Sequence, residues 1–270
     1  KGGVFLDTFM KYGINHQMIK SKQQNSLFEA SMIEIPPPEI PQAERLSDLE
    51  RLNKERELVG VYLSSHPLEP YSLLLDYVCN VSLKDFSSGL DKFVGKDIIM
   101  GGIVTVYREG ITQKGAPYGI ITLEDYSGTA EIPLFSKNFV EFGAYGKKDL
   151  YLLVYGKVEL AKYNNKPQLR LSKIMLMDEA MKSQIKEMVI VVDSQEMDSS
   201  NTNLLKSVLE KSLSGTTDLR FEIVDKTQGF SVELYSRTKK VTIDKALVSA
   251  LDEIEGITIK INGKVAEKKQ

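Results

Sequence analysis

The sequence is poor in the residues that build redox and metal sites. Among 270 residues it has one cysteine, Cys79, two histidines, His16 and His66, and no tryptophan. A single thiol cannot form an internal disulfide, and these three residues do not give the ligand spacing of a zinc site. No metal ligand is therefore assigned, and so little cysteine is typical of a protein from the reducing cytoplasm.

Long hydrophobic runs are also missing. No apolar stretch approaches the roughly 20 residues that a membrane-spanning helix needs, and no signal-peptide pattern opens the chain. Charged residues make up 27% of the sequence. These features exclude a membrane protein. The chain begins at Lys1 without a methionine, which we expect of a piece of a longer protein.

The signatures of catalysis are absent too. There is no glycine-rich phosphate loop, no nucleophile elbow and no paired-histidine motif. The adjacent carboxylates Glu124 and Asp125 lead into a turn, where aspartate is favoured for backbone hydrogen bonding, and His66 has no evident partner as a base. No catalytic residue is assigned, and no cofactor is implied by these residues.

Charge is unevenly distributed along the chain. The net charge is −2, but residues 95–177 carry +3 between flanks of −3 and −2. A basic middle region favours a polyanionic partner there.

The first third of the chain divides into a linker and a helical segment. Residues 1–45 begin with apolar residues, Leu6 to Tyr12, that could be the end of a helix. They also contain Pro36, Pro37, Pro38 and Pro41, which favour an extended linker. Residues 46–94 show leucines at three- and four-residue steps, which predict a helix that stops at Pro67. We expect His66 to donate to the last carbonyls of that helix.

Residues 95–177 have the pattern of a β-barrel. Three β-rich segments end near Phe135, a short helix capped by Ser136 follows with Val140 facing inward, and two more strands flank a hairpin at Asn164-Asn165. Three strands, one helix and two strands in about 80 residues is the order of the five-stranded OB-fold barrel.

Residues 178–270 alternate strands and helices in a different pattern, with Asp244 predicted to cap the last helix. The predicted fold is therefore mixed: a helical and linker N-terminal segment, a central five-stranded OB-fold β-barrel and a small C-terminal α+β domain.

The barrel carries basic and aromatic residues on its predicted turns and last hairpin. In the OB fold, such residues bind single-stranded nucleic acid through phosphate contacts and base stacking. An ordinary solvated surface is the alternative for any one of them. The candidate nucleic-acid-binding residues are Arg108, Lys114, Tyr118, Lys157, Lys162, Tyr163, Lys166 and Arg170.

A second candidate site lies in the linker. Gln24, Ser26, Leu27 and Phe28 form a glutamine followed by small polar residues and an exposed Leu-Phe pair. Such an exposed apolar anchor is typical of a docking motif. The alternative is that Leu27 and Phe28 attach the linker to its own domain.

Two stretches resemble a known family. Residues 54–68 (KERELVGVYLSSHPL) and 119–128 (GIITLEDYSG) resemble, in the same order, segments of the alpha subunit of bacterial replicative DNA polymerase III. The residues from Gln24 to Phe28 fall where that family carries its internal sliding-clamp-binding motif. The resemblance is strong over about 45–177 and weaker over 188–262, which is similar to the family's domain that docks on the tau subunit of the clamp loader.

This resemblance implies a non-catalytic C-terminal region of a DNA-directed DNA polymerase, a nucleotidyltransferase that uses Mg²⁺ elsewhere in its chain. The implied partners are single-stranded template DNA, the sliding clamp (beta) and the clamp loader tau subunit, with no membrane. The runner-up is a stand-alone OB-fold module that binds single strands or tRNA. A polymerase-associated hydrolase would need a metal cluster that the sequence lacks.

Overall fold

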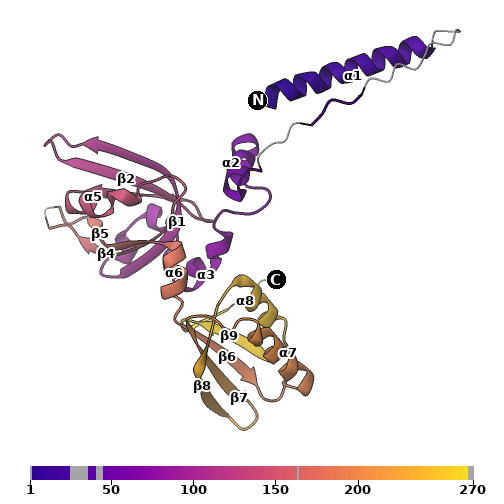
Figure 1. The fold of residues 1–270 in the computed structure, drawn as a ribbon. Helices are drawn as coiled ribbons and strands as arrows, with labels where there is room; N and C mark the ends of the chain where they lie inside the picture. Colours follow the sequence, from indigo (N-terminus) through magenta and orange to yellow (C-terminus); the bar gives the residue numbers. More distant parts are fainter. Residues whose placement is uncertain (1, 25–35, 41–44, 163, 267–270) are drawn as a thin grey trace. The chain divides into compact units, whose positions relative to one another are not determined.

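The computed structural model describes residues 2–24, 36–40, 45–162 and 164–266 (Figure 1). The chain forms two compact units, residues 1–60 and 61–270.

The described residues of the first unit form helices α1 (Gly2–Gln24) and α2 (Asp48–Val59). Helix α1 continues through the polar residues from Lys20, where the sequence predicted the linker, as far as Gln24. Polar side chains such as lysine and glutamine are good helix formers, so their polarity alone did not mark the end of the helix.

Helix α2 begins with a capping box and ends earlier than predicted. The Ser47 hydroxyl accepts from the Glu50 backbone N–H at 3.3 Å, and the Glu50 carboxylate accepts from the Ser47 N–H at 2.9 Å. At the other end Gly60 takes a φ of 89°, the left-handed conformation that glycine adopts without steric cost. The helix therefore stops at Gly60, not at Pro67. The prediction for His66 was also wrong: its Nδ1 accepts from the Leu68 N–H at 3.2 Å.

The second unit begins with short helices that lead into a barrel. These helices are η1 (Glu69–Tyr71), α3 (Ser72–Tyr77), α4 (Leu83–Ser88) and η2 (Asp91–Phe93). The barrel elements are β1 (Asp97–Ile111), β2 (Pro117–Glu124), β3 (Thr129–Phe135), α5 (Lys137–Phe142), η3 (Gly143–Tyr145), β4 (Tyr151–Leu160) and β5 (Pro167–Leu176).

The barrel strands are hydrogen-bonded in the order β3-β2-β1-β4-β5, and every neighbouring pair is antiparallel. Strand β1 is shared: residues 97–103 pair with β4, and residues 103–111 pair with β2. Strands β3 and β5 lie at the two ends of this order and do not pair with each other in the described sheet, and helix α5 lies between β3 and β4 in the chain. This arrangement is that of a partly open OB barrel. The predicted OB fold is confirmed.

A β-bulge in β1 decides which side chains face outward. The register shifts between Val104 and Val106, so one extra residue reverses the inside-outside alternation beyond that point. Val104 is fully buried and Val106 is 46% exposed. Tyr107 therefore faces the interior and Arg108 faces solvent.

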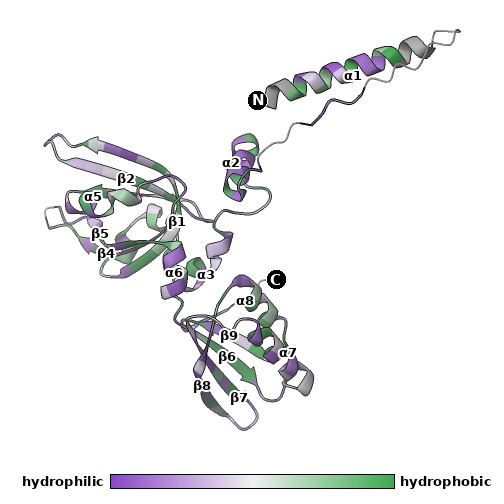
Figure 2. Ribbon diagram, viewed as in Figure 1, coloured by the Kyte–Doolittle hydropathy of each residue, from purple (hydrophilic) through white to green (hydrophobic). Residues whose placement is uncertain are grey.

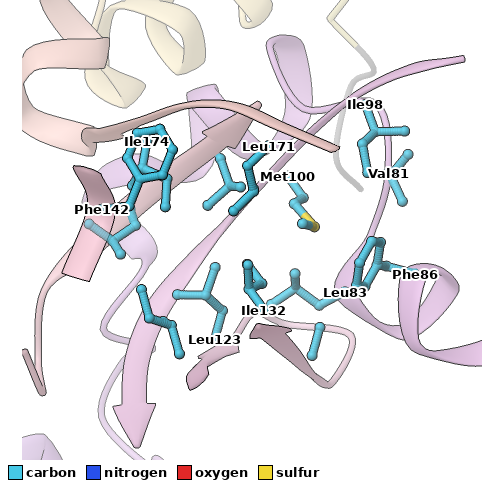
Figure 3. Packing of buried hydrophobic residues seen from close by; sticks show 14 of the residues in the cluster. Val81, Leu83, Phe86, Ile98, Met100, Leu123, Ile132, Phe142, Leu171 and Ile174 are labelled. Carbon is cyan, nitrogen blue, oxygen red and sulfur yellow. The ribbon is translucent and has the colours of Figure 1, made fainter. Parts of the chain in front are cut away.

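The core of the barrel draws on segments outside the five strands. Figure 3 shows Val81, Leu83 and Phe86, from the α4 region, packed with Met100 and Ile132 of the strands. Buried apolar surface is the main source of folding free energy. The α4 region is therefore part of the packed barrel.

One carboxylate attaches α4 to the barrel. Asp125, in the turn between β2 and β3, accepts from the N–H groups of Leu83 at 2.9 Å, Ser127 at 2.7 Å and Gly128 at 3.0 Å. Its role is the turn-forming one expected from its place in the sequence.

Two details of α5 correct the predictions. Ser136 makes no side-chain cap hydrogen bond, because its φ of 49° departs from the extended backbone that a capping residue adopts. Val140 is 83% exposed, whereas Phe142 is buried. The predicted hairpin turn is confirmed by the positive φ of 54° at Asn165.

Residues 177–266 form a second sheet with helices. The elements are α6 (Met177–Ser183), β6 (Glu187–Asp193), α7 (Ser199–Glu210), β7 (Thr217–Asp225), β8 (Phe230–Val241), α8 (Lys245–Asp252), β9 (Ile257–Ile261) and β10 (Lys264–Val265). The strand order is β10-β9-β6-β7-β8.

Among the described strand pairs of this sheet, only β6 and β7 are parallel, and α7 makes the crossover that a parallel pair needs. Asp198 caps α7 by accepting from the Asn201 N–H, and Asp244 caps α8 by accepting from the Leu247 N–H, each at 2.7 Å. The predicted α+β domain and the Asp244 cap are confirmed.

Candidate nucleic-acid interface

The outer face of β1, β2 and β3 carries an aromatic pair. Tyr118 of β2 lies directly opposite Phe135 of β3, with ring centroids 5.8 Å apart and ring planes tilted by 38°. Phe135 is 52% exposed. Because every base has a π-face, exposed rings on this face of an OB fold can stack on single-stranded nucleic acid.

A glycine beneath the tyrosine sets the position of this pair. Gly110 of β1 lies opposite Tyr118, and a Cβ at Gly110 would come within 2.8 Å of the Tyr118 ring. A real Cβ atom essentially never lies that close to another heavy atom, so any side chain at position 110 would displace the ring. The absence of a side chain on β1 therefore lets Tyr118 lie across the strand.

The candidate cation on this face, Arg108, is already neutralised. Its guanidinium pairs with the carboxylate of Glu131 on β3, and the two side chains are 58% and 55% exposed. A phosphate that approaches Arg108 meets the neighbouring carboxylate as well. Stacking, more than charge, is what this face offers to a ligand.

Two other candidates lie on a different part of the barrel. Lys157 of β4 lies opposite Arg170 of β5, and the Arg170 guanidinium is 3.4 Å from the Glu159 carboxylate. Strand β1 separates β4 from β2 in the sheet order. The structure thus divides the predicted residues between the β1–β2–β3 face and the β4–β5 strands.

Three lysines lie in the loops at the strand ends. Lys114 lies between β1 and β2, and Lys162 and Lys166 lie between β4 and β5. All three are exposed, and none of the three forms an ion pair within the described residues. These ammonium groups are therefore available to meet phosphates. Tyr163 lies outside the described residues.

Tyr107, the neighbour of Arg108, belongs to the interior. A Cβ at Gly146 would lie 2.3 Å from its ring, its hydroxyl is buried without a hydrogen-bond partner in the described structure, and burial raises its pKa to about 12. Tyr107 therefore packs in the barrel and is not available for base stacking.

The candidate clamp-binding residues fall at the end of α1 and beyond it. Gln24 is the last residue of α1. Ser26, Leu27 and Phe28 lie outside the described residues, so their proposed docking stays a prediction.

No cluster of three or more His, Cys, Asp or Glu side chains within the described residues could hold a metal ion. Cys79 is buried, and this burial raises the pKa of its thiol to about 12. In the same residues no helix is both long and apolar enough to cross a membrane.

Sequence reasoning missed two residues of the interface, Phe135 and Glu131. Both lie on β3 with exposed side chains that alternate with buried Ile132 and Leu134. This alternation is visible in the sequence and could have placed both residues on one outward face. Their partners Tyr118 and Arg108 depend on strand register, which the sequence alone does not fix.

Comparison with known proteins gives two kinds of similarity. Residues 188–262 match the family described as DNA polymerase III alpha subunit, C-terminal domain. The DNA polymerase III subunit alpha of Haemophilus influenzae is 30% identical over 165 residues, and that of Escherichia coli K12 is 32% identical over 166 residues. Each match covers 61% of this chain and 14% of the relative, so the chain spans a small part of the length of these relatives.

Among solved structures, one similar chain is the replication factor A related protein from Methanobacterium thermoautotrophicum. It is 11% identical with a TM-score of 0.25, over 37% of this chain and 91% of that one. Another is the second OB-fold domain of replication protein A from Methanococcus maripaludis, 16% identical with a TM-score of 0.21, over 31% of this chain and 85% of that one.

Proposed function

This chain is similar to a C-terminal region of the bacterial DNA polymerase III alpha subunit, and from that premise we propose that it is the non-catalytic, DNA-binding part of a replicative polymerase. The OB barrel binds the single-stranded template. The polymerase chemistry, nucleotidyl transfer with Mg²⁺, belongs to another part of the protein, and the chain works in the cytoplasm.

The observation that carries the DNA-binding proposal is the aromatic pair of Tyr118 and Phe135. Phe135 is 52% exposed and Tyr118 is half-buried beside it; a large exposed ring costs solubility unless a ligand covers it, and the pair lies on the face that OB folds use for oligonucleotides. The exposed loop lysines Lys114, Lys162 and Lys166 supply the phosphate contacts. Arg108 contributes little because Glu131 neutralises it.

Two protein partners complete the proposal. The segment from Gln24 to Phe28 holds the polymerase on the sliding clamp, and residues 178–270 associate with the clamp loader tau subunit. The similarity of residues 188–262 to the C-terminal domain of the polymerase alpha subunit supports the second assignment. Deletion of residues 178–270 should abolish tau association, which a pull-down with purified tau measures. The deletion should leave DNA binding and clamp binding intact.

Binding of a fluorescent oligo(dT) strand, followed by anisotropy, tests the DNA interface. We expect the logarithm of the affinity to fall with the logarithm of the salt concentration with a slope of about −2, because three lysine–phosphate contacts each contribute about −0.7. Replacement Phe135→Ala should weaken binding by about 5- to 150-fold, the cost of about 1–3 kcal/mol for one stacked base.

The matched control is Phe230→Ala. Phe230 is 49% exposed against 52% for Phe135, but it belongs to the second sheet. Equal losses from the two substitutions would remove the DNA interface from the β1–β2–β3 face, and a flat salt response would remove the phosphate contacts of the loop lysines.

A further inference from the structure

The last strand of the second sheet has an uncovered apolar face. Strand β8 lies at the open end of the sheet order, and β7 is its one extensive neighbour among the described elements. Phe230, Val232 and Leu234 are 49%, 46% and 48% exposed. They alternate with Ser231, Glu233 and Tyr235 along β8, and Figure 2 shows hydrophobic and hydrophilic colours mixed along the β7–β8 hairpin.

The strand register places these residues on the side of the sheet that the helices cover. Leu234 lies opposite Phe221, and Val232 lies opposite Ile223. Phe221 also lines a groove of about 320 Å³ between α7 and β7. We call Phe221, Ile223, Phe230, Val232 and Leu234 the β8 face. It continues the floor of this groove outward to the edge of the sheet.

The opposite side of the same hairpin is polar and carries ion pairs. Arg220 pairs with Glu187 and, at 3.2 Å, with Glu233, and the Tyr235 hydroxyl donates to Glu233 at 2.6 Å. A hairpin exposed on both sides to water would need no apolar side. The hairpin is therefore built to be covered on its helix side.

The uncovered part of the layer is about one edge strand wide. Helix α8 contacts β9, and α7 contacts α8 and reaches β7 at the groove. A helix with its side chains is about 10 Å wide and strands lie about 4.8 Å apart, so two helices cover about four strands. The β8 face is the remaining fifth position of the layer.

The charge around the groove favours an acidic occupant. Lys206 of α7 and Lys239 of β8 line the groove, and Arg237 of β8 is exposed two residues before Lys239. None of these three forms an ion pair within the described residues. The single acidic residue of the groove lining is Glu210.

We infer that the β8 face and the groove along α7 dock an amphipathic helix of a partner protein, with its apolar stripe on the β8 face and acidic residues beside Lys206 and Lys239. An added strand would pair with the edge of β8 but would leave the apolar side chains bare, so a helix fits better than a strand. This inference rests on the proposed role of residues 178–270 in binding a protein partner.

A selection experiment tests the inference on the full chain. A phage library of helical peptides of about 16 residues, about four helical turns, is selected against the immobilised 270-residue chain. We expect enriched peptides to carry apolar residues at i, i+3, i+4 and i+7 with acidic flanks. Their binding to Val232→Asp should be at least about tenfold weaker, because the substitution buries an unpaired charge at the centre of the contact.

The matched control is Ser231→Asp, which adds the same charge to the adjacent residue on the polar side of the strand. We expect its peptide affinity to equal that of the unmodified chain, and thermal unfolding shows that both variants fold. The charge-reversed pair Lys206→Glu with Lys239→Glu should prefer peptides with basic flanks.

Several results would overturn the inference: no enrichment, enriched peptides without helical spacing, or equal binding by Val232→Asp. A dimer that sedimentation detects and that Val232→Asp abolishes would assign the face to a second copy of the chain. Tau association could be lost on deletion of residues 178–270 but retained in Val232→Asp. That result would refute the docking role of the β8 face alone, and the proposed function would stand.

Discussion

Replacement Glu131→Gln should strengthen DNA binding by releasing Arg108. The glutamine keeps the size of the side chain and removes its charge, so the guanidinium on the β1–β2–β3 face loses its ion-pair partner. A released arginine beside the Tyr118–Phe135 pair can meet a backbone phosphate. Glutamate at position 131 also repels phosphate directly, so both effects act in the same direction.

The expected magnitude follows from counterion release. Lys114, Lys162 and Lys166 give a log–log salt slope of about −2, and a fourth contact from Arg108 makes it about −2.8, at roughly −0.7 per phosphate. Between about 200 mM and about 50 mM salt, this difference widens the affinity ratio of variant to wild type about 2.6-fold. Folding should change little, because an ion pair with side chains 58% and 55% exposed contributes about 0–1 kcal/mol.

Anisotropy with a labelled oligo(dT) strand at several salt concentrations measures the slope. The double variant Glu131→Gln with Arg108→Ala should return to about the wild-type slope, which isolates the contribution of Arg108. The parallel variant Glu159→Gln releases Arg170 on the β4–β5 strands and should leave the slope unchanged. A steeper slope in Glu159→Gln but not in Glu131→Gln would refute the assignment and place the DNA on β4 and β5.

Two further predictions concern other residues. Replacing Leu27 and Phe28 together by alanine should abolish clamp binding and processive synthesis without changing the melting temperature, since burial in a clamp groove would contribute roughly 1.5–3 kcal/mol for each side chain. A melting temperature lower by several degrees with clamp binding intact would instead show that the pair stabilises the chain's own fold. Cys79 should resist iodoacetamide at about pH 8 in the folded chain and react in denaturant, because a pKa raised from 9.0 to about 12 lowers the thiolate fraction about a thousandfold; intact mass spectrometry follows the reaction, and rapid labelling of the folded chain would contradict the burial.

Local signals in the sequence predicted the features that depend on a few adjacent residues. The ends of the barrel strands, the positive φ at Asn165 and the Asp244 cap follow from turn and cap chemistry within about four residues. The end of α2 was misplaced, because Gly60 competes with Pro67 as a stop signal and only the three-dimensional cap decides between them.

Features that depend on register could not be read from the sequence. The bulge between Val104 and Val106 reverses the alternation along β1, which turns Tyr107 inward and Arg108 outward. The pairing of Arg108 with Glu131, 23 residues away in the chain, then follows from the alignment of three strands. A candidate list built on residue type alone therefore contained the right cation without the carboxylate that neutralises it.

The attachment of α4 to the barrel bears on how this OB fold can be moved between proteins. Leu83 and Phe86 fill the barrel interior, and Asp125 binds the first turn of α4 through the Leu83 N–H. A gene segment that encodes only the five strands would leave those core positions empty and the Asp125 carboxylate without one of its donors. The smallest piece that recombination could transplant intact begins before Val81, so the helices ahead of the strands and the barrel are inherited together.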